Sequence, residues 1–219
     1  MVVFCGAKRG DIMMHVSSQA EPVSFDTRVR VPGNSFLSSC PSPTGKQMRK
    51  HSYWQRIEDE LYAAYSGICA YTCEYIPKTV TNSSVDHFWP KSTHPYLAYE
   101  WGNYRLSSQK ANNNKGDTIG LVDPFEACVG WFVLEFPSCL VKVGEGLSPS
   151  DKSRVESTIR VLKLNMDDEY VQSRCDVILD YINGDISLNY LWKIRPFIAH
   201  ELTRQGILNS VQAMFKSRK

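Results

Sequence analysis

The sequence has no apolar run long enough to cross a bilayer. Its longest apolar stretches, such as VGWFVLEF at 129–136, are far shorter than the roughly 20 residues that a transmembrane helix needs. The N-terminus lacks the uninterrupted apolar segment of a secretory signal. The composition has none of the biases of collagen, mucins or disordered chains. We therefore expect a globular cytoplasmic protein that does not contact a membrane.

The sequence also lacks a strong charge and a paired cysteine framework. The formal net charge is +2, so any attraction for phosphate must come from local clusters of Lys and Arg. An odd and scattered set of cysteines argues against disulfides and predicts reduced thiols. The seven cysteines lie at positions 5, 40, 69, 73, 128, 139 and 175.

The chain divides into three predicted regions. Residues 1–50 are rich in Ser, Pro and Gly, which predicts an extended, loop-rich N-terminal arm. Residues 51–147 begin with a predicted helix from about Ser52 to Gly67, where apolar residues recur at helical spacing. The same region contains a predicted β-hairpin, with strands at 129–136 and 140–144.

Residues 148–219 have the spacing of a helical layer. The apolar residues predict one helix around Val155, a second that ends at Asn183 and Gly184, and a third that begins at Leu188. Pro196 should break or restart the third helix. A final helix should carry Phe197, Leu202, Ile207, Val211 and Met214 on its apolar face. Together these regions predict the α+β class.

The stretch VDHFWPKSTHPYLAYEWGNYRLSSQKANNNKGD, at 85–117, carries the candidate catalytic residues. It contains Asp86, His87, Asn103, Asn112 and Lys115 at the spacing of a one-metal nuclease site. Cleavage of a phosphodiester requires an activated water and neutralisation of charge on the phosphate. A neutral imidazole at His87 is a competent general base. The oxygens of Asp86 and Asn112 suit Mg²⁺ or Mn²⁺.

The local pattern around these residues predicts a strand, a loop, a strand and a helix. Asp86 and His87 can reach one phosphate only if the first strand ends there, and Pro90 supports that ending. NYRLSS should form the second strand, and NNNKGD should begin a helix with Asn112 in its first turn. We expect Lys115, one turn on, to present its charge to a phosphate near the positive end of that helix.

The combination of Asp-His, then Asn, then Asn-x-x-Lys resembles the HNH endonuclease family, which has a ββα-metal fold. The longer phrases DHFWPKS, LAYEWGN and NNNKGD resemble the HNH nucleases of anti-phage defence, such as the PtuB nucleases of Septu systems and related retron effectors. The clear match covers about residues 68–117, with weaker similarity afterwards. The resemblance implies a nuclease core with a flanking N-terminal helix, a β-hairpin and a helical C-terminal layer.

The resemblance also implies roles and partners. His87 would be the general base, Asp86 and Asn112 the metal ligands, and Asn103 the residue that holds the loop in shape. An ATPase of the ABC or SMC-like type would act with the nuclease, and the N-terminal arm and C-terminal layer are candidate docking surfaces. Nucleic acid, as DNA or RNA, would be the substrate.

The sequence departs from the family where many members bind a structural zinc through two Cys-x-x-Cys pairs. Here the first pair is stretched to Cys69 and Cys73, and the second would fall at Ser108 and Ala111. We therefore expect no zinc and a brace made by aromatic packing instead. The aromatic residues expected in this brace are Tyr71, Tyr75, Trp89 and Trp101.

Several basic and aromatic residues leave two interpretations open. Trp101 and Tyr104 either stack on bases or, more in keeping with their place, belong to the core. Basic side chains either bind the nucleic-acid backbone or form an ordinary solvated surface. Beside a helix N-terminus their positive charge would be unfavourable with the helix macrodipole, and a bound phosphate would offset that cost. The candidate nucleic-acid-binding residues are Lys46, Arg49, Lys50, Lys91, Arg105, Lys110 and Lys115.

A second hypothesis is a catalytically silent HNH-like module that binds nucleic acid or protein. It predicts salt-sensitive binding without a cleavage product. Because such a site reads backbone phosphate, the motif does not separate DNA from RNA.

Overall fold

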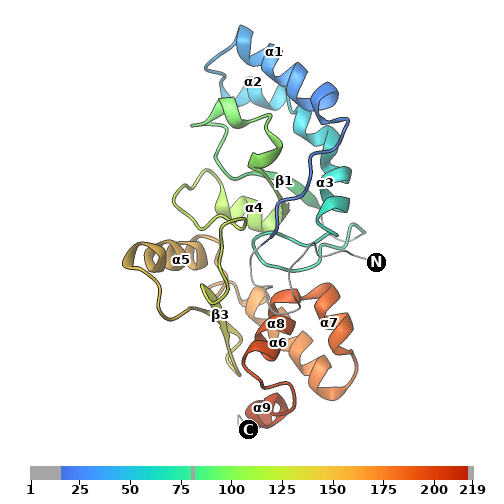
Figure 1. The fold of residues 1–219 in the computed structure, drawn as a ribbon, viewed down its shortest axis with the longest axis vertical. Helices are drawn as coiled ribbons and strands as arrows, with labels where there is room; N and C mark the ends of the chain where they lie inside the picture. The colour runs from blue at the N-terminus through green and yellow to red at the C-terminus, as the bar shows by residue number, and fades with distance from the viewer. Residues whose placement is uncertain (1–15, 80–81, 217–219) are drawn as a thin grey trace. The chain divides into compact units, whose positions relative to one another are not determined.

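The computed structural model describes residues 16–79 and 82–216 (Figure 1). Helices and two antiparallel two-stranded sheets place the chain in the α+β class. The described chain forms two compact units. We call residues 18–69 and 76–119 the β1–β2 unit, and residues 16–17, 70–75 and 120–216 the β3–β4 unit. In the described ranges, no helix combines the length and the apolar character needed to traverse a bilayer.

The β1–β2 unit is built from short elements. A π-helical turn, η1 (Asp26–Arg30), leads directly into α1 (Val31–Ser39), and α2 (Gly45–Lys50) follows. Next come η2 (Tyr53–Ile57) and α3 (Glu58–Ala64). The remaining elements are β1 (Ser83–His87), η3 (Pro95–Leu97), η4 (Trp101–Asn103), β2 (Tyr104–Ser108) and α4 (Gln109–Lys115).

The predicted extended arm is helical from Asp26 to Ser39 and contributes to a core. Phe25 and Val29 are fully buried, and the Phe25 ring meets the Trp101 ring edge-on at 5.7 Å. Gly33 lies so close to the Tyr99 ring that an added Cβ would clash with it. The Ser, Pro and Gly content suggested a loop, but burial of these apolar side chains outweighs the weak local propensity. The first fifteen residues of the predicted arm lie outside the described residues.

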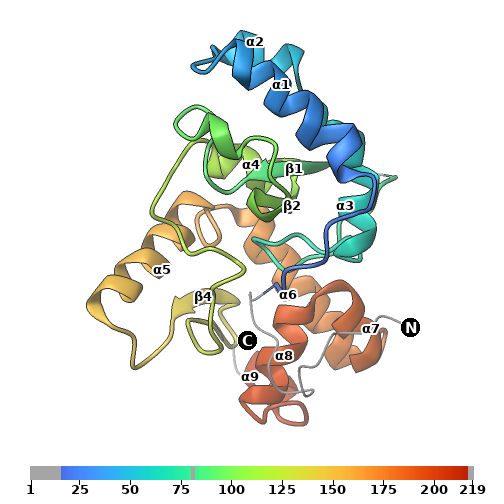
Figure 2. The ribbon, with the colours of Figure 1, turned by 45° about the horizontal axis from the view of Figure 1, so that its top comes forward.

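The strand, strand and helix expected between 85 and 117 are present. Strands β1 and β2 pair antiparallel, with His87 opposite Tyr104, and α4 packs on both strands (Figure 2). The helix begins at Gln109, with Ser108 accepting a hydrogen bond from the N–H of Ala111 as its cap. The predicted start at NNN was therefore wrong by one turn, because the Ser108 cap starts the helix earlier.

The β3–β4 unit combines a hairpin with helices. The strands β3 (Phe132–Glu135) and β4 (Leu140–Val143) form the predicted hairpin. The helices are α5 (Pro149–Val161), α6 (Asp168–Asn183), α7 (Leu188–Ile194), α8 (Pro196–Arg204) and α9 (Val211–Lys216). Helix α5 packs against β4, and α8 packs against β3 and α7.

Two predictions for this unit need correction. The final helix is divided into α8 and α9, because Gly206 adopts a left-handed φ of 66° between them. The predicted boundary at 147 also separates the hairpin from the helices, whereas the structure groups them in one unit. The helix predicted from Ser52 is present as η2 and α3, and Gly67 follows with φ 70°.

Candidate active site

A cavity of about 390 Å³ opens in the β1–β2 unit beside the end of β1 and the end of α4. The predicted residues Asp86, His87 and Asn112 all line it. Strand β1 ends at His87, as expected, and Asp86 and His87 both line the cavity although they are consecutive paired residues of the strand. The remaining wall comes from Val85, Pro90, Lys91, Asn113, Gly116 and Asp117.

The His87 ring is fixed in one orientation and one tautomer. Its Nε2 lies 2.9 Å from the carbonyl oxygen of Ala98, which also accepts a hydrogen bond from the Tyr104 hydroxyl at 2.8 Å. A carbonyl oxygen only accepts, so Nε2 carries the proton and Nδ1 of the neutral ring has a lone pair. No group in residues 16–79 and 82–216 donates a hydrogen bond to Nδ1. This is the protonation state that a general base needs.

The surroundings of His87 keep the ring neutral. The pKa of His87 is lowered from 6.5 to about 3, mainly by burial; the charges of Lys91 and Lys115 also lower it, and the hydrogen bond to Ala98 partly offsets them. The Trp54 ring meets the imidazole edge-on at 4.7 Å. An anionic phosphate beside Nδ1 would favour the imidazolium form and raise this pKa. The site therefore holds a neutral base whose basicity would increase when phosphate arrives.

Two of the predicted metal ligands line the cavity, although no cluster of three or more His, Cys, Asp or Glu side chains suited to a metal ion occurs within residues 16–79 and 82–216. Asp86 supplies a carboxylate, and the Asn112 amide is oriented by its Nδ2, which donates to the Ser84 hydroxyl at 3.0 Å. That orientation leaves Oδ1 of Asn112 as the amide atom available to a cation. Carboxylate and amide oxygens are among the ligands that Mg²⁺ and Mn²⁺ prefer.

Lys115 lies in a different place from the predicted one. Its side chain is fully buried, and its ammonium is 3.2 Å from both carboxylate oxygens of Asp86 and donates to the His87 carbonyl at 2.9 Å. Lys115 does not line the cavity. Because the ammonium at the end of α4 is occupied by Asp86 and the His87 carbonyl, it offsets the charge of Asp86 and is not exposed to the cavity, where we expected it to meet a phosphate.

Asn103 holds the loop after β1. Its Oδ1 accepts the N–H of Trp89 at 2.8 Å, and its Nδ2 donates to the carbonyls of Trp89 at 3.0 Å and Leu97 at 3.1 Å. The side chain is buried and does not line the cavity. This geometry matches the expected role as a loop anchor.

The other predicted nucleic-acid-binding residues separate into buried and exposed groups. Arg105, a candidate nucleic-acid-binding residue, is buried, and its guanidinium donates to the carbonyls of Gly102 and Tyr104 and is not presented at the surface. Lys91 is partly exposed on the cavity wall, and Lys110 is partly exposed on α4. Three further basic residues are exposed on α2: Lys46, Arg49 and Lys50.

The electrostatic position of the α2 cluster also differs from the expectation. Arg49 and Lys50 occupy the last turn of α2, where the macrodipole stabilises a cation. Thr44 and Gln47 cap the first turn in a reciprocal capping box. Arg49 and Lys50 therefore need no phosphate to offset a local cost, whereas Lys46 lies in the first turn of α2.

The predicted aromatic brace is only partly present. Trp101 and Tyr104 are buried, so the core interpretation of these residues was correct. Trp89 is 42 % exposed and does not belong to a packed brace.

The Cys69 thiol lies at the β2–α4 junction, where its sulfur accepts the N–H of Ser108 at 3.4 Å. The six cysteines within the described residues are free thiols, and Cys5 lies outside them.

Sequence reasoning missed two polar residues that line the cavity and one that orients a lining side chain. Ser84 orients Asn112, and Asn113 and Asp117 line the wall. Asp117 follows Gly116, whose positive φ of 50° turns the chain after α4. The phrase NNNKGD contained Asn113 and Asp117, but only the direction of the helix end shows that they face the cavity.

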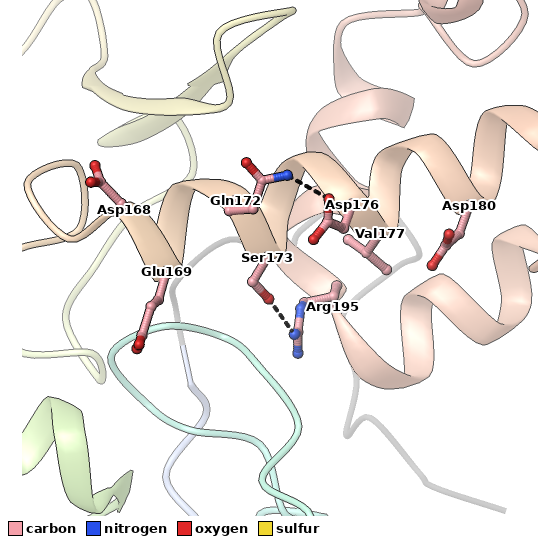
Figure 3. Close-up of a pocket in the computed structure, with 8 residues that line it drawn as sticks. All are labelled: Asp168, Glu169, Gln172, Ser173, Asp176, Val177, Asp180 and Arg195. Atoms are coloured by element: carbon pink, nitrogen blue, oxygen red, sulfur yellow. Dashed lines mark hydrogen bonds between the residues drawn. The ribbon is translucent and has the colours of Figure 1, made fainter.

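A second, larger cavity of about 630 Å³ lies along α6 in the β3–β4 unit (Figure 3). Four acidic residues and Arg195 line it, without a histidine. Arg195 donates to the Ser173 hydroxyl at 2.9 Å, and Gln172 donates to Asp176 at 2.6 Å. This wall lacks a base next to a cation site. The β1–β2 cavity is therefore the better candidate for catalysis.

No family model and no curated protein matches the chain.

Proposed function

We propose that the chain is a metal-dependent endonuclease of the HNH type that hydrolyses phosphodiester bonds in nucleic acid. The observation that carries the proposal is one cavity that is lined by Asp86, Asn112 and His87, whose Nε2 is bound to the Ala98 carbonyl and whose Nδ1 is thereby left unprotonated. The order of β1, β2 and α4 supports it, because this order is the ββα arrangement that the sequence resemblance implies. The free thiols at the described cysteines fit the expected cytoplasmic location.

In this proposal His87 removes a proton from water at Nδ1, while Nε2 stays bound to the Ala98 carbonyl. Asp86 and Asn112 would hold Mg²⁺ or Mn²⁺, and the bound cation would supply neutralisation of the phosphate charge and help for the departing oxygen. Asn103 fixes the loop that follows His87, so the base does not change position during the reaction. The ion pair with Lys115 partly offsets the negative charge of Asp86.

The test is a cleavage assay on plasmid DNA, single-stranded DNA, total RNA and tRNA, in magnesium and in EDTA. We expect a product in magnesium and none in EDTA. His87→Ala, and His87→Gln with its larger side chain, should both lower the cleavage rate by at least about 100-fold, because each removes the base. A matched control is His200→Ala, which removes a buried histidine from the β3–β4 unit.

Thermal unfolding of each variant separates chemistry from folding. A folded His87 variant that cleaves at the wild-type rate would refute the proposed base. If the wild-type rate in EDTA equals the rate in magnesium, the metal-dependent mechanism is excluded.

A catalytically silent binding module is the second candidate, and the Asp86–Lys115 ion pair favours it. An ammonium at 3.2 Å from both oxygens of Asp86 competes with a cation for the same negative charge. This candidate predicts salt-sensitive binding to nucleic acid without product in any metal.

We further propose an anti-phage role with an ATPase partner of the ABC or SMC-like type, on the sequence resemblance alone. Deletion of residues 1–45 would not test docking cleanly, because it removes the buried Phe25 and Val29 from the β1–β2 core. The cleavage assay with and without the product of the neighbouring gene is the cleaner test. An unchanged rate, substrate range and elution volume in gel filtration would count against the partnership.

A further inference from the structure

Beside the candidate active site, three aromatic rings lie in a row on the loop that follows β1. We call Trp89, His94 and Tyr96 the aromatic row. The ring centroids of Trp89 and His94 are 5.0 Å apart, and those of His94 and Tyr96 are 5.8 Å apart. Trp89 is 42 % exposed and Tyr96 is 64 % exposed. Two large aromatic side chains are thus exposed to solvent close to one another.

The aromatic row is not needed for the core of the unit. Trp54, Trp101, Tyr99 and Tyr104 are buried and supply the core aromatic contacts. The indole N–H of Trp89 and the hydroxyl of Tyr96 have no hydrogen-bond partner within the part of the chain that the structure describes. Exposed aromatic rings with available polar atoms are typical of a recognition surface.

The loop that carries the row is held rigidly. Asn103 binds both backbone groups of Trp89, and the carbonyl of Pro90 accepts the N–H groups of Thr93 at 3.1 Å and His94 at 2.7 Å. The Thr93 hydroxyl also lies 2.9 Å from Nδ1 of His94. A ligand that stacks on these rings therefore needs little further ordering of the loop.

The row is continuous with the cavity. Pro90 and Lys91 follow Trp89 directly in the chain and line the wall that also contains Asp86 and His87. Lys91 is positive and partly exposed, so it can meet a backbone phosphate while neighbouring bases lie on the rings. Aromatic faces beside a cation form the arrangement that binds single-stranded nucleic acid without sequence preference.

We infer that the aromatic row stacks on unpaired bases and so selects single-stranded nucleic acid, or unpaired segments of a folded one, for the cavity. In a duplex each base face is covered by its neighbours, so the rings have no face to stack on. The inference rests on the proposed nuclease function for its biological meaning, but it concerns binding and not chemistry. DNA and RNA share the base faces, and the row accepts both.

The test measures the dissociation constants of fluorescent single-stranded DNA, single-stranded RNA and duplex DNA by anisotropy, with the wild-type chain in EDTA. We expect tighter binding of both single strands than of the duplex. The Trp89→Ala/Tyr96→Ala double variant should lose at least about tenfold in affinity for single strands and little for the duplex. Trp89→Phe/Tyr96→Phe should keep most of the affinity, because the ring faces remain.

The matched control is Tyr190→Ala, which removes an aromatic that is 47 % exposed on α7 in the other unit. It should bind like the wild type. An equal loss for single strands and duplex, or no loss, would overturn the inference, and no loss would leave the row as a surface for a protein partner. Selective binding without metal-dependent cleavage would support the row while refuting the nuclease.

Discussion

Each unit of the molecule buries a carboxylate and a histidine that are neighbours in sequence. The two pairs differ in the hydrogen bonds that their side chains make. In the β1–β2 unit, His87 binds the Ala98 carbonyl and lines a cavity together with Asp86. In the β3–β4 unit, Nδ1 of His200 lies 3.2 Å from the carboxylate of Glu201 itself. The same two residue types can therefore form a candidate catalytic pair or a structural one, according to the atoms that they contact.

The partners of the second carboxylate explain the difference. Glu201 is fully buried and accepts hydrogen bonds from Nε and Nη2 of Arg204 at 2.7 and 2.8 Å. It also accepts the N–H of Leu134 at 3.0 Å and the side chain of Gln205 at 3.1 Å. These donors tie α8 to β3, so the carboxylate joins elements of the fold. Asp86, by contrast, is part of a cavity wall.

The largest expected effect is on folding, when Lys115 is replaced. Lys115→Met leaves the Asp86 carboxylate buried without its ammonium, and we expect a loss of about 3–5 kcal/mol in the free energy of unfolding. Arg204→Met should cost less, about 1–3 kcal/mol, because Glu201 keeps three other donors. Urea unfolding measures both changes. A larger loss for Arg204→Met than for Lys115→Met would contradict this account of the two carboxylates.

Asp86→Asn tests the chemical half of the comparison. Asn keeps the shape of the side chain and accepts a hydrogen bond from Lys115, but it removes the anionic oxygen from the proposed cation site. We expect the cleavage rate to fall on the order of 100-fold, and the magnesium concentration needed for half-maximal rate to rise. The measurement is a magnesium titration of the cleavage rate.

Glu201→Gln is the matched control for that experiment. It removes the buried carboxylate of the other unit, which lies outside the candidate active site. At a temperature where the variant is folded, its cleavage rate and magnesium dependence should equal those of the wild type. A loss of rate comparable with that of Asp86→Asn would show that both carboxylates affect catalysis.

The stability of the β3–β4 unit should depend on pH through Glu201. Burial raises the pKa of Glu201, but hydrogen bonds from Arg204, His200 and the Leu134 N–H outweigh it and lower the pKa from 4.5 to about 2. A depressed carboxyl pKa stabilises the fold fully above pH 4.5, and this contribution disappears as the pH falls toward 2. A shift of this size corresponds to about 3 kcal/mol.

Urea unfolding between pH 6 and pH 2 gives the measurement. We expect the wild type to lose more stability over this range than Glu201→Gln does, by up to about 3 kcal/mol. Glu126→Gln is the control, since Glu126 is mostly exposed and pairs with Arg154 at the surface. Its pH profile should follow that of the wild type. Identical profiles for wild type and Glu201→Gln would exclude the structural role.

The parts that were predictable from the sequence are those with short-range causes. The turn after β1 and the helix after β2 lie within 85–117, and Asp86, His87 and Asn112, which the motif and its resemblance singled out together, line the same cavity. Whether the side chains of Lys115 and Arg105 are buried or exposed was not predictable. A long basic side chain can extend into solvent or pair with a buried carboxylate or carbonyl. That choice depends on tertiary packing. The helix at 31–39 was missed for the same reason.

The smallest expected effect concerns the basic residues that the sequence left undecided. Lys91 lines the cavity and lies 5.4 Å from the Trp54 ring, whereas Lys50 is exposed on α2 and Lys193 on α7 of the other unit. We expect Lys91→Gln to weaken single-strand binding a few-fold and to lower the salt slope by about 1, because one phosphate contact is lost.

Lys50→Gln and Lys193→Gln should leave the slope unchanged. Both lysines lie in the last turn of a helix, where the macrodipole already stabilises them, so their positions imply no phosphate. The measurement is the dissociation constant in EDTA over a series of salt concentrations. If Lys50→Gln lowers the slope as much as Lys91→Gln does, the binding surface extends from the cavity to α2. If Lys193→Gln does so, the β3–β4 unit also contacts the strand, and the contrast between the two units no longer holds for binding.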